Sequence, residues 1–316
     1  MTAAPVIVTG AAGFVGRHLL ELLAPLGPVV GWFRPGEPAP DLDGVRWTAV
    51  ELLDANAVAA ALADAAPSAI YHLAGMPHVG DSWAKAEETF AGNVVATLNL
   101  FDAMRAQGRR CRVLVTGSAT IYKPSNAALT EDDPLAPNTP YGTSKLAQEL
   151  ASLRVWREHG IPVIVSRSFN HTGPRQSPAF VAPAFARQLA RIEAGLMPPV
   201  MKVGNLEAHR DISDVRDTVR AYHALMTHGR PGTCYNVCAG TAVSMQAVLD
   251  GLRRHIRVPV TVEQDPARMR PADTPVVLGD ASRLKADTGW APASPFDATL
   301  ADLVQYWRDD AARESA

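Results

Sequence analysis

The chain has 316 residues, of which 47% are hydrophobic and 20% charged, and its formal net charge is −2. This composition is typical of a folded globular enzyme, and the length allows one large α/β unit or two coupled lobes. The near-neutral charge argues against nucleic acid or an anionic membrane as a partner. No apolar run reaches the length of a membrane span, and no leader precedes the first predicted strand. We therefore expect a cytoplasmic protein without a membrane or nucleic-acid partner.

The cysteines predict neither a disulfide framework nor a metal site. Cys111, Cys234 and Cys238 are odd in number and lack a framework spacing. Cys234 and Cys238 lie close in sequence, but no histidine or second cysteine pair completes a ligand set. We expect reduced, buried thiols and no bound metal, as is usual in the cytosol.

A glycine-rich turn follows the first predicted strand, Val6–Thr9, and apolar residues then repeat at helical spacing. A strand, a glycine turn and a helix in this order form a dinucleotide-binding opening. Glycines let the backbone approach a pyrophosphate, and the helix N-terminus offers free N–H groups and a positive dipole end. The spacing is G-x-x-G-x-x-G, and a glycine turn without a ligand is the alternative. We predict that the cofactor contacts this turn through Gly10, Ala12, Gly13, Phe14, Val15 and Gly16.

The end of the second predicted strand, Val29–Phe33, indicates which adenosine ribose fits. An acidic residue there would bind a 2′-hydroxyl, whereas an arginine suits a 2′-phosphate. This chain has Arg34 and no acid before Glu37. The pattern favours NADP(H), with NAD(H) as the second option, and a solvated surface arginine is the alternative interpretation.

Four more strands are predicted at 45–50, 69–73, 112–115 and 161–166, with helices between them. One helix begins after Asp54, and another runs from Ser82 or Ala84 to Ala106 with Asn93 near its middle. Six strands alternating with helices predict a parallel, doubly wound sheet of the Rossmann type. Residues at the carboxyl ends of these strands should contact the cofactor, namely Glu51, Leu52, Leu73, Ala74 and Gly75.

Tyr141 and Lys145 are four residues apart in a predicted helix, so they share one face. A nearby ammonium should lower the pKa of the phenol and make it a proton donor for reducing a carbonyl. Ser118, at the end of the 112–115 strand, could hydrogen-bond the same substrate oxygen. The alternatives are an exposed amphipathic helix and a serine that only caps the turn.

After residue 168 the chain becomes richer in polar loops and isolated arginines. The segment 168–177 is typical of a binding loop, and it precedes a helix at 180–194 and a strand at 200–203. Arg210 and Arg270 suit bidentate binding of a diphosphate, although a surface salt bridge is the usual fate of such arginines. We expect a Rossmann domain at 1–168, joined by part of about 211–240, and a smaller α/β substrate lobe at 169–316.

The glycine turn, Ser118, Tyr141 and Lys145, in this order, resemble the extended short-chain dehydrogenase/reductase family over essentially the whole chain. Segments 168–177, 203–211, 235–240 and 265–271 resemble the GDP-4-keto-6-deoxy-D-mannose reductases. The resemblance implies a carboxyl-terminal lobe that binds a nucleotide sugar, and a homodimer through the helices around 141–159, for which a buried intramolecular face is the alternative. It also implies two further groups of contacts: with the cofactor, Asn93, Tyr141, Lys145, Ser168 and His171; with the substrate, Ser118, Thr120, Asn170, Arg175, Val203, Asn205, Arg210 and Arg270.

Dehydratases of this family carry an acidic pair directly after the residue that matches Ser118, where this chain has Ala119 and Thr120. Neither side chain can shuttle the protons of water elimination. The resemblance therefore implies a cytoplasmic NADPH-dependent 4-ketoreductase of deoxysugar biosynthesis, acting on a GDP- or dTDP-linked 4-keto-6-deoxyhexose. The segment 118–122 resembles that of UDP-galactose 4-epimerases, so an epimerase with tightly bound NAD is the first alternative. A non-catalytic dinucleotide sensor or scaffold is the second.

Overall fold

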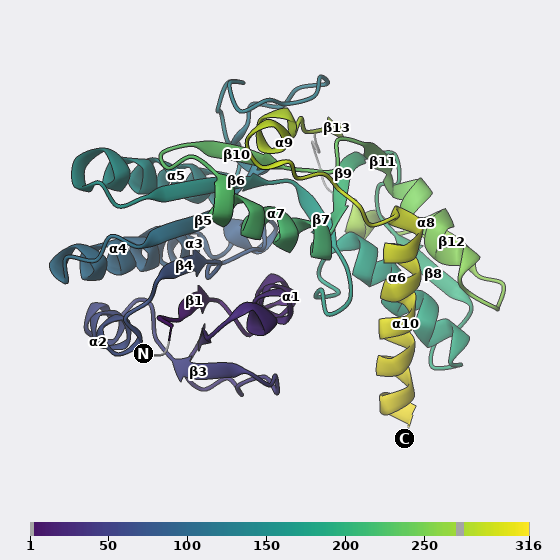
Figure 1. The fold of residues 1–316 in the computed structure, drawn as a ribbon. Coiled ribbons are helices and arrows are strands. Elements are labelled where there is room, and N and C mark those ends of the chain that lie inside the picture. The colour runs from purple at the N-terminus through teal and green to yellow at the C-terminus, as the bar shows by residue number, and fades with distance from the viewer. Residues whose placement is uncertain (1–2, 270–274, 316) are drawn as a thin grey trace.

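The computed structural model describes residues 3–269 and 275–315, and its centre is one twisted sheet of seven parallel strands (Figure 1). The strand order is β10-β6-β5-β4-β1-β2-β3, so the connections run outward in both directions from β1 and β4. This is the doubly wound, Rossmann-type arrangement that the alternation of strands and helices predicts. The strands are β1 (Val6–Thr9), β2 (Val29–Phe33), β3 (Val45–Ala49), β4 (Ala69–His72), β5 (Arg112–Ser118), β6 (Val163–Ser168) and β10 (Cys234–Val237).

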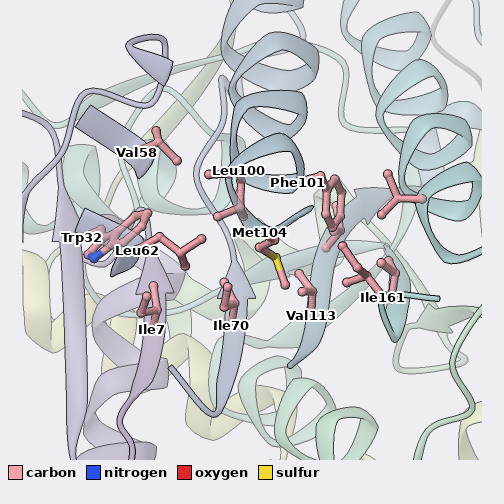
Figure 2. Close-up of a cluster of buried hydrophobic side chains, with 14 of the residues drawn as sticks. Ile7, Trp32, Val58, Leu62, Ile70, Leu100, Phe101, Met104, Val113 and Ile161 are labelled. Atoms are coloured by element: carbon pink, nitrogen blue, oxygen red, sulfur yellow. The ribbon is translucent and has the colours of Figure 1, made fainter. Parts of the chain in front are cut away.

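Helices cover both faces of the sheet, which explains why the central strands consist mainly of apolar residues. One face carries α1 (Phe14–Leu23), α7 (Val215–His228) and α9 (Ser282–Thr288). The other carries α2 (Ala55–Ala65), α4 (Ala96–Ala106) and α5 (Pro140–His159). Figure 2 shows how side chains of α2 and α4, among them Leu62, Leu100 and Met104, pack onto the strands.

A second hydrophobic core lies in the smaller lobe, where α6, α8 and α10 pack together beside the main sheet (Figure 1). Two small sheets accompany it, one formed by β8 and β12 and the other by β7, β9, β11 and β13. The helices are α6 (Val181–Glu193), α8 (Met245–Arg254) and α10 (Phe296–Ser315). The strands are β7 (Asn170–Thr172), β8 (Val200–Val203), β9 (His209–Asp214), β11 (Ala242–Ser244), β12 (Thr261–Gln264) and β13 (Val276–Val277).

Three elements differ from the sequence-based expectation. The predicted helix at 82–106 is divided into η2 (Asp81–Trp83), α3 (Ala86–Phe90), a π-helical turn η3 (Ala91–Val95) and α4. β5 continues to Ser118, beyond the predicted end at residue 115, and β6 runs over Val163–Ser168 where a strand at 161–166 was expected. The remaining short turns are η1 (Ala24–Leu26), η4 (Ala119–Ile121) and η5 (Pro266–Arg268). No helix among the described residues is long and apolar enough to cross a membrane.

A buried ion pair connects α5 to the sheet. Arg167 on β6 donates from Nε and Nη2 to the two carboxylate oxygens of Glu149, at 2.9 and 2.7 Å. Its Nη1 donates to the Tyr122 hydroxyl at 2.9 Å, and that hydroxyl donates to Asn236 Oδ1 on β10 at 2.6 Å. Because both charges are desolvated, their hydrogen bonds must compensate a cost of several kcal/mol per ion. The pair is therefore sensitive to the loss of either partner.

We predict that Glu149→Ala lowers the free energy of unfolding by about 3–5 kcal/mol, because Arg167 would remain charged, buried and without its carboxylate. Urea denaturation measures the change. The matched control is Glu158→Ala on the same helix. Glu158 pairs with Arg154 at 2.9 Å on the surface, where such a pair contributes about 0.3–0.5 kcal/mol. Equal losses in the two variants would contradict the prediction.

Candidate active site

The glycine turn between β1 and α1 packs closely against the end of β4. Gly10 has φ +65°, and a Cβ at this position would lie 2.9 Å from the backbone of Ala74. A Cβ at Gly16 would lie 2.3 Å from the Gly10 carbonyl oxygen. Gly13 is the N-cap of α1 and places no side chain over the free N–H groups. The turn therefore has the open helix N-terminus and the close backbone approach that a dinucleotide pyrophosphate requires.

The other residues predicted to contact the adenosine half follow neighbouring strands. Arg34 comes directly after β2, is 64% exposed in its side chain and lies 3.9 Å from Glu37. Glu51 follows β3, and its carboxylate accepts a hydrogen bond from the Leu53 backbone at 3.0 Å. The carboxyl ends of parallel strands share one edge of the sheet, so these residues lie on the same edge as the glycine turn. The same edge carries Leu52, Leu73, Ala74 and Gly75.

Tyr141 lies in the first turn of α5, where Pro140 takes the first helical position and the Thr139 side chain caps the helix at Gly142 N. Only 8% of Tyr141 is exposed, and burial raises the pKa of its phenol to about 12, against the effect of a hydrogen bond with Ser118. The pKa of this phenol is therefore raised and not lowered as the spacing of Tyr141 and Lys145 predicted, because desolvation is the largest effect on it. A raised pKa keeps the phenol protonated at neutral pH.

Lys145 is also buried, with 5% of its surface exposed, and desolvation lowers the pKa of its ammonium to about 8. Its Nζ donates to the Thr116 carbonyl and to Gln148 Oε1, both at 2.9 Å, and lies 6.0 Å from the centre of the Tyr141 ring. Neither acceptor was predicted from the sequence. The helical spacing of Lys145 and Gln148 was the only available signal for the second one.

Ser118 is the last residue of β5, and its oxygen accepts a hydrogen bond from Thr120 N at 3.2 Å. It therefore caps the short turn η4, as the structural interpretation predicts. The same oxygen lies 3.0 Å from the Thr120 hydroxyl and contacts Tyr141. The two interpretations are compatible, because a hydroxyl oxygen can accept and donate at the same time.

Asn93 joins the loop after β4 to α5 and lies in the π-helical turn η3, a feature often found at functional sites. Its Oδ1 accepts from Met76 N at 2.8 Å, and its Nδ2 donates to Ser144 Oγ at 2.9 Å. A Cβ at Gly75 would lie 2.4 Å from Asn93 Oδ1 and 3.7 Å from Lys145 Nζ. The structure thus brings Gly75, Asn93 and Lys145 together, and their contact with a cofactor stays a prediction.

His171 lies beside the start of α1. Its ring is nearly parallel to that of Phe14, with centroids 6.0 Å apart, and its Nδ1 donates to the Phe169 carbonyl at 3.0 Å. Burial lowers the pKa of His171, so the imidazole is neutral at pH 7 and its Nε2 is available as an acceptor. Ser168 Oγ is 2.7 Å from the Tyr222 hydroxyl on α7. These contacts connect the segment after β6 to α1 and the last residue of β6 to α7.

Several residues predicted to contact the substrate have partners within the protein. Arg175 has φ +74°, and its Nη1 lies 2.6 Å from the Glu21 carboxylate on α1. Arg210 donates to the His209 carbonyl at 2.8 Å, and Asn205 Oδ1 accepts from Glu207 N at 2.9 Å. Val203 is buried at the end of β8, Asn170 begins β7, and Arg270 lies outside the described residues. Contact of these residues with a sugar nucleotide remains a prediction.

The described part of the chain contains no group of three or more His, Cys, Asp or Glu side chains placed to hold a metal ion. Cys234 and Cys238 are buried and Cys111 is half-buried, and all three are free thiols. Ser118, Tyr141 and Lys145 meet at the edge of the sheet that holds the glycine turn, and a catalytic role for them stays a prediction.

A Rossmann-type sheet with this glycine turn and this serine, tyrosine and lysine defines an extended short-chain dehydrogenase/reductase. Comparison with known families agrees, because the profile for GDP-mannose 4,6 dehydratase matches residues 7–303. The chain belongs to the GDP-mannose 4,6-dehydratase family of extended short-chain dehydrogenases/reductases.

Individual relatives cover nearly the full length. The chain is 34% identical to GDP-6-deoxy-D-mannose reductase of Pseudomonas aeruginosa, over 97% of this chain and 98% of the relative. The structure of RMD from Pseudomonas aeruginosa complexed with NADPH superposes with a TM-score of 0.86 at 33% identity, over 98% and 100% of the two chains. A putative epimerase from Burkholderia cenocepacia superposes with a TM-score of 0.88 at 36% identity, over 98% and 99%.

We predict that Gly16→Ala weakens NADPH binding by roughly tenfold or more, because the new methyl group would press on the Gly10 carbonyl and displace the turn. Titration with NADPH, followed by nicotinamide fluorescence, measures the affinity, and circular dichroism verifies that the variant is folded. A folded variant with the affinity of the wild type would show that the turn does not hold the dinucleotide.

Proposed function

We propose that this protein is an NADPH-dependent 4-ketoreductase acting on a nucleotide-activated 4-keto-6-deoxyhexose. The observation that carries the proposal is the buried cluster of Ser118, Tyr141 and Lys145 beside Gly75. Directly after Ser118 the chain has Ala119 and Thr120, where the dehydratases have two acids. Such a cluster can donate a proton to a carbonyl oxygen. It lacks, at 119 and 120, the acid and base that water elimination needs.

In the proposed reaction the glycine turn after β1 would hold NADPH, whose nicotinamide would be the source of the hydride that reduces the ketone carbon. Tyr141 donates its phenolic proton to the ketone oxygen, so the ketone becomes an alcohol and the tyrosine becomes a phenolate. A pKa raised to about 12 keeps Tyr141 protonated before this step. The Lys145 ammonium, 6.0 Å from the tyrosine ring, stabilises the phenolate, while Ser118 donates a hydrogen bond to the ketone oxygen. Solvent then reprotonates the phenolate.

Two observations support NADPH over NADH. Directly after β2 the chain has Arg34 and no acidic residue before Glu37. The side chain of Arg34 is 64% exposed, as expected of an arginine that binds a 2′-phosphate. The structurally similar RMD from Pseudomonas aeruginosa is complexed with NADPH. NAD(H) is the second option, because a similar UDP-glucose 4-epimerase from Thermus thermophilus is in complex with NAD.

The lobe at 169–316 is the proposed site of the sugar nucleotide, with Thr120 contributed by the Rossmann domain. The proposed lining from the lobe itself is Asn170, Arg175, Val203, Asn205, Arg210 and Arg270. A GDP-linked substrate is supported by the 34% identity to a GDP-6-deoxy-D-mannose reductase. A dTDP-linked sugar is the second option. Epimerisation is the second candidate function, supported by the segment 118–122 and by the putative epimerase of Burkholderia cenocepacia at 36% identity.

We predict stoichiometric oxidation of NADPH when the protein is mixed with GDP- or dTDP-4-keto-6-deoxyhexose, followed at the absorbance band of the reduced nicotinamide. Tyr141→Phe removes the proton donor, so it should bind NADPH normally and lose turnover by roughly a hundredfold or more. Sugar isomerisation without loss of NADPH would favour the epimerase. If neither the GDP-linked nor the dTDP-linked sugar is changed, both the ketoreductase and the epimerase activity are rejected. Wild-type turnover by Tyr141→Phe would reject the mechanism.

We also propose a homodimer whose interface lies on the outer face of α5 and its neighbours. α5 packs against η2, α3, η3 and α4, and large apolar side chains are exposed on these adjacent elements. Exposed apolar side chains gathered on one face indicate an interaction surface. The exposed residues are Trp83, Phe90, Val95, Leu98 and Leu150.

We predict that Leu150→Arg produces a monomer, because a charge would then be buried in the apolar interface. Sedimentation equilibrium measures the mass of the assembly. Leu26→Arg is the matched control, since Leu26 is 64% exposed, against 54% for Leu150, and follows α1 on the opposite face of the sheet. A wild type that is already monomeric, or equal dissociation of both variants, would contradict the proposed interface.

A further inference from the structure

A continuous chain of buried hydrogen bonds runs from Lys145 to the ends of β1 and β4. Lys145 Nζ donates to Gln148 Oε1 at 2.9 Å, and Gln148 Nε2 donates to Thr97 Oγ1 at 2.8 Å. The same Thr97 oxygen is 2.9 Å from His72 Nε2, and His72 Nδ1 is 2.8 Å from Thr9 Oγ1. All five side chains are at most 5% exposed. Solvent water therefore cannot supply the hydrogen bonds that these polar groups need.

The direction of every bond in this chain follows from Lys145 at one end and from Thr97 in its middle. An ammonium can only donate, so Gln148 must turn its oxygen to Lys145 and its NH2 group to Thr97. The Thr97 hydroxyl donates its single proton to the Asn93 carbonyl at 2.7 Å, so it can only accept from Gln148 and His72. His72 therefore carries its proton on Nε2 and accepts from Thr9 at Nδ1.

The remaining contacts agree with this assignment. Burial, with a contribution from the charge of Lys145, lowers the pKa of His72 to about 3, so its ring is neutral and one nitrogen can accept. Thr9, having donated to His72, accepts from Ala74 N at 3.1 Å, directly before Gly75. If the Gln148 amide were rotated by half a turn, its NH2 group would point at the Lys145 ammonium, which is also a donor. Its oxygen would then point at the Thr97 hydroxyl oxygen, which would lose the hydrogen bond donated by Gln148. The orientation of Gln148 is thus determined by its surroundings.

We propose that Gln148 is a positioning residue, which holds the ammonium of Lys145 in place between the Tyr141 ring and Gly75 through an amide whose orientation the Thr97, His72 and Thr9 side chains impose. Lysine has a long, flexible side chain, and two fixed acceptors, the Thr116 carbonyl and Gln148 Oε1, restrict its ammonium to one position. The role rests on the proposed function, since it acts through Lys145.

The charges around this group determine how the role can be tested. The charge of Lys145 contributes to lowering the pKa of His72 on β4, and Tyr222 on α7 contributes to raising the pKa of Tyr141. Glu149, the next residue of α5, is held by Arg167. A carboxylate at position 148 would therefore act directly on Lys145. It would favour the ammonium and raise the pKa of Lys145, whereas an apolar side chain of similar length would remove an acceptor and lower it further.

We predict opposite shifts for Gln148→Glu and Gln148→Met. Since the pKa of Lys145, about 8, is lower than that of Tyr141, about 12, the alkaline limb of kcat/KM for reduction should follow Lys145. The limb should move to higher pH in Gln148→Glu and to lower pH in Gln148→Met, by about one unit. Gln148→Met should also lower kcat by roughly tenfold to a hundredfold with KM for the sugar nearly unchanged, because a hydrogen bond to a charged group is lost.

The control is Gln107→Met, which removes a half-buried glutamine bond to the Ala59 carbonyl, at 2.7 Å, far along α4 from the site. It should leave the pH profile unchanged. Titration of Lys145 by NMR in protein with 13C-labelled lysine measures the same shifts without any sugar. The proposal is overturned if both variants keep the wild-type midpoint of Lys145. If no sugar is reduced but the midpoints move as expected, the assigned reaction fails while the positioning of Lys145 by Gln148 stands.

Discussion

The buried ammonium of Lys145 is the constraint on which the rest of the site depends. An ammonium without water needs acceptors at hydrogen-bond distance, and here the Thr116 carbonyl at the end of β5 and the Gln148 amide supply them. Meeting that requirement fixes the end of β5 against α5. Because Ser118 ends the same strand and Tyr141 begins the same helix, the three groups proposed to react are brought together by the need to solvate one charge.

A similar requirement joins the two lobes. Arg167 and Glu149 fix α5 against β6, and Tyr122 extends this contact to β10, a strand supplied by the second half of the chain. The buried Asp211 carboxylate on β9 accepts from Ala239 N and Gly240 N at 2.7 and 2.9 Å, just beyond β10. Each buried charge is satisfied by groups from another element, so the cofactor edge and the smaller lobe are held at a defined separation.

The fold was predictable because its signals are local. Alternating strands and helices, the glycine turn after β1 and the helical spacing of Tyr141 and Lys145 are all visible within short windows of sequence. The series of buried hydrogen bonds from Lys145 to Ala74 was not predictable from the sequence. Its members are distant along the polypeptide, since Thr97 and Gln148 are 51 residues apart and Thr9 and His72 are 63 residues apart. For the same reason the π-helical turn at Asn93 and the pairing of Arg175 with Glu21 emerge only when distant segments are assembled.

The amino-acid sequence alone determined the doubly wound sheet, the order of the glycine turn, serine, tyrosine and lysine, and the family to which they belong, because these depend on residue type and spacing. Only the tertiary structure decided the electrostatics. Spacing indicated that Lys145 would lower the pKa of Tyr141, yet burial raises it to about 12 and lowers that of Lys145 to about 8. Desolvation depends on everything that packs around a group, and no spacing along the chain contains that information.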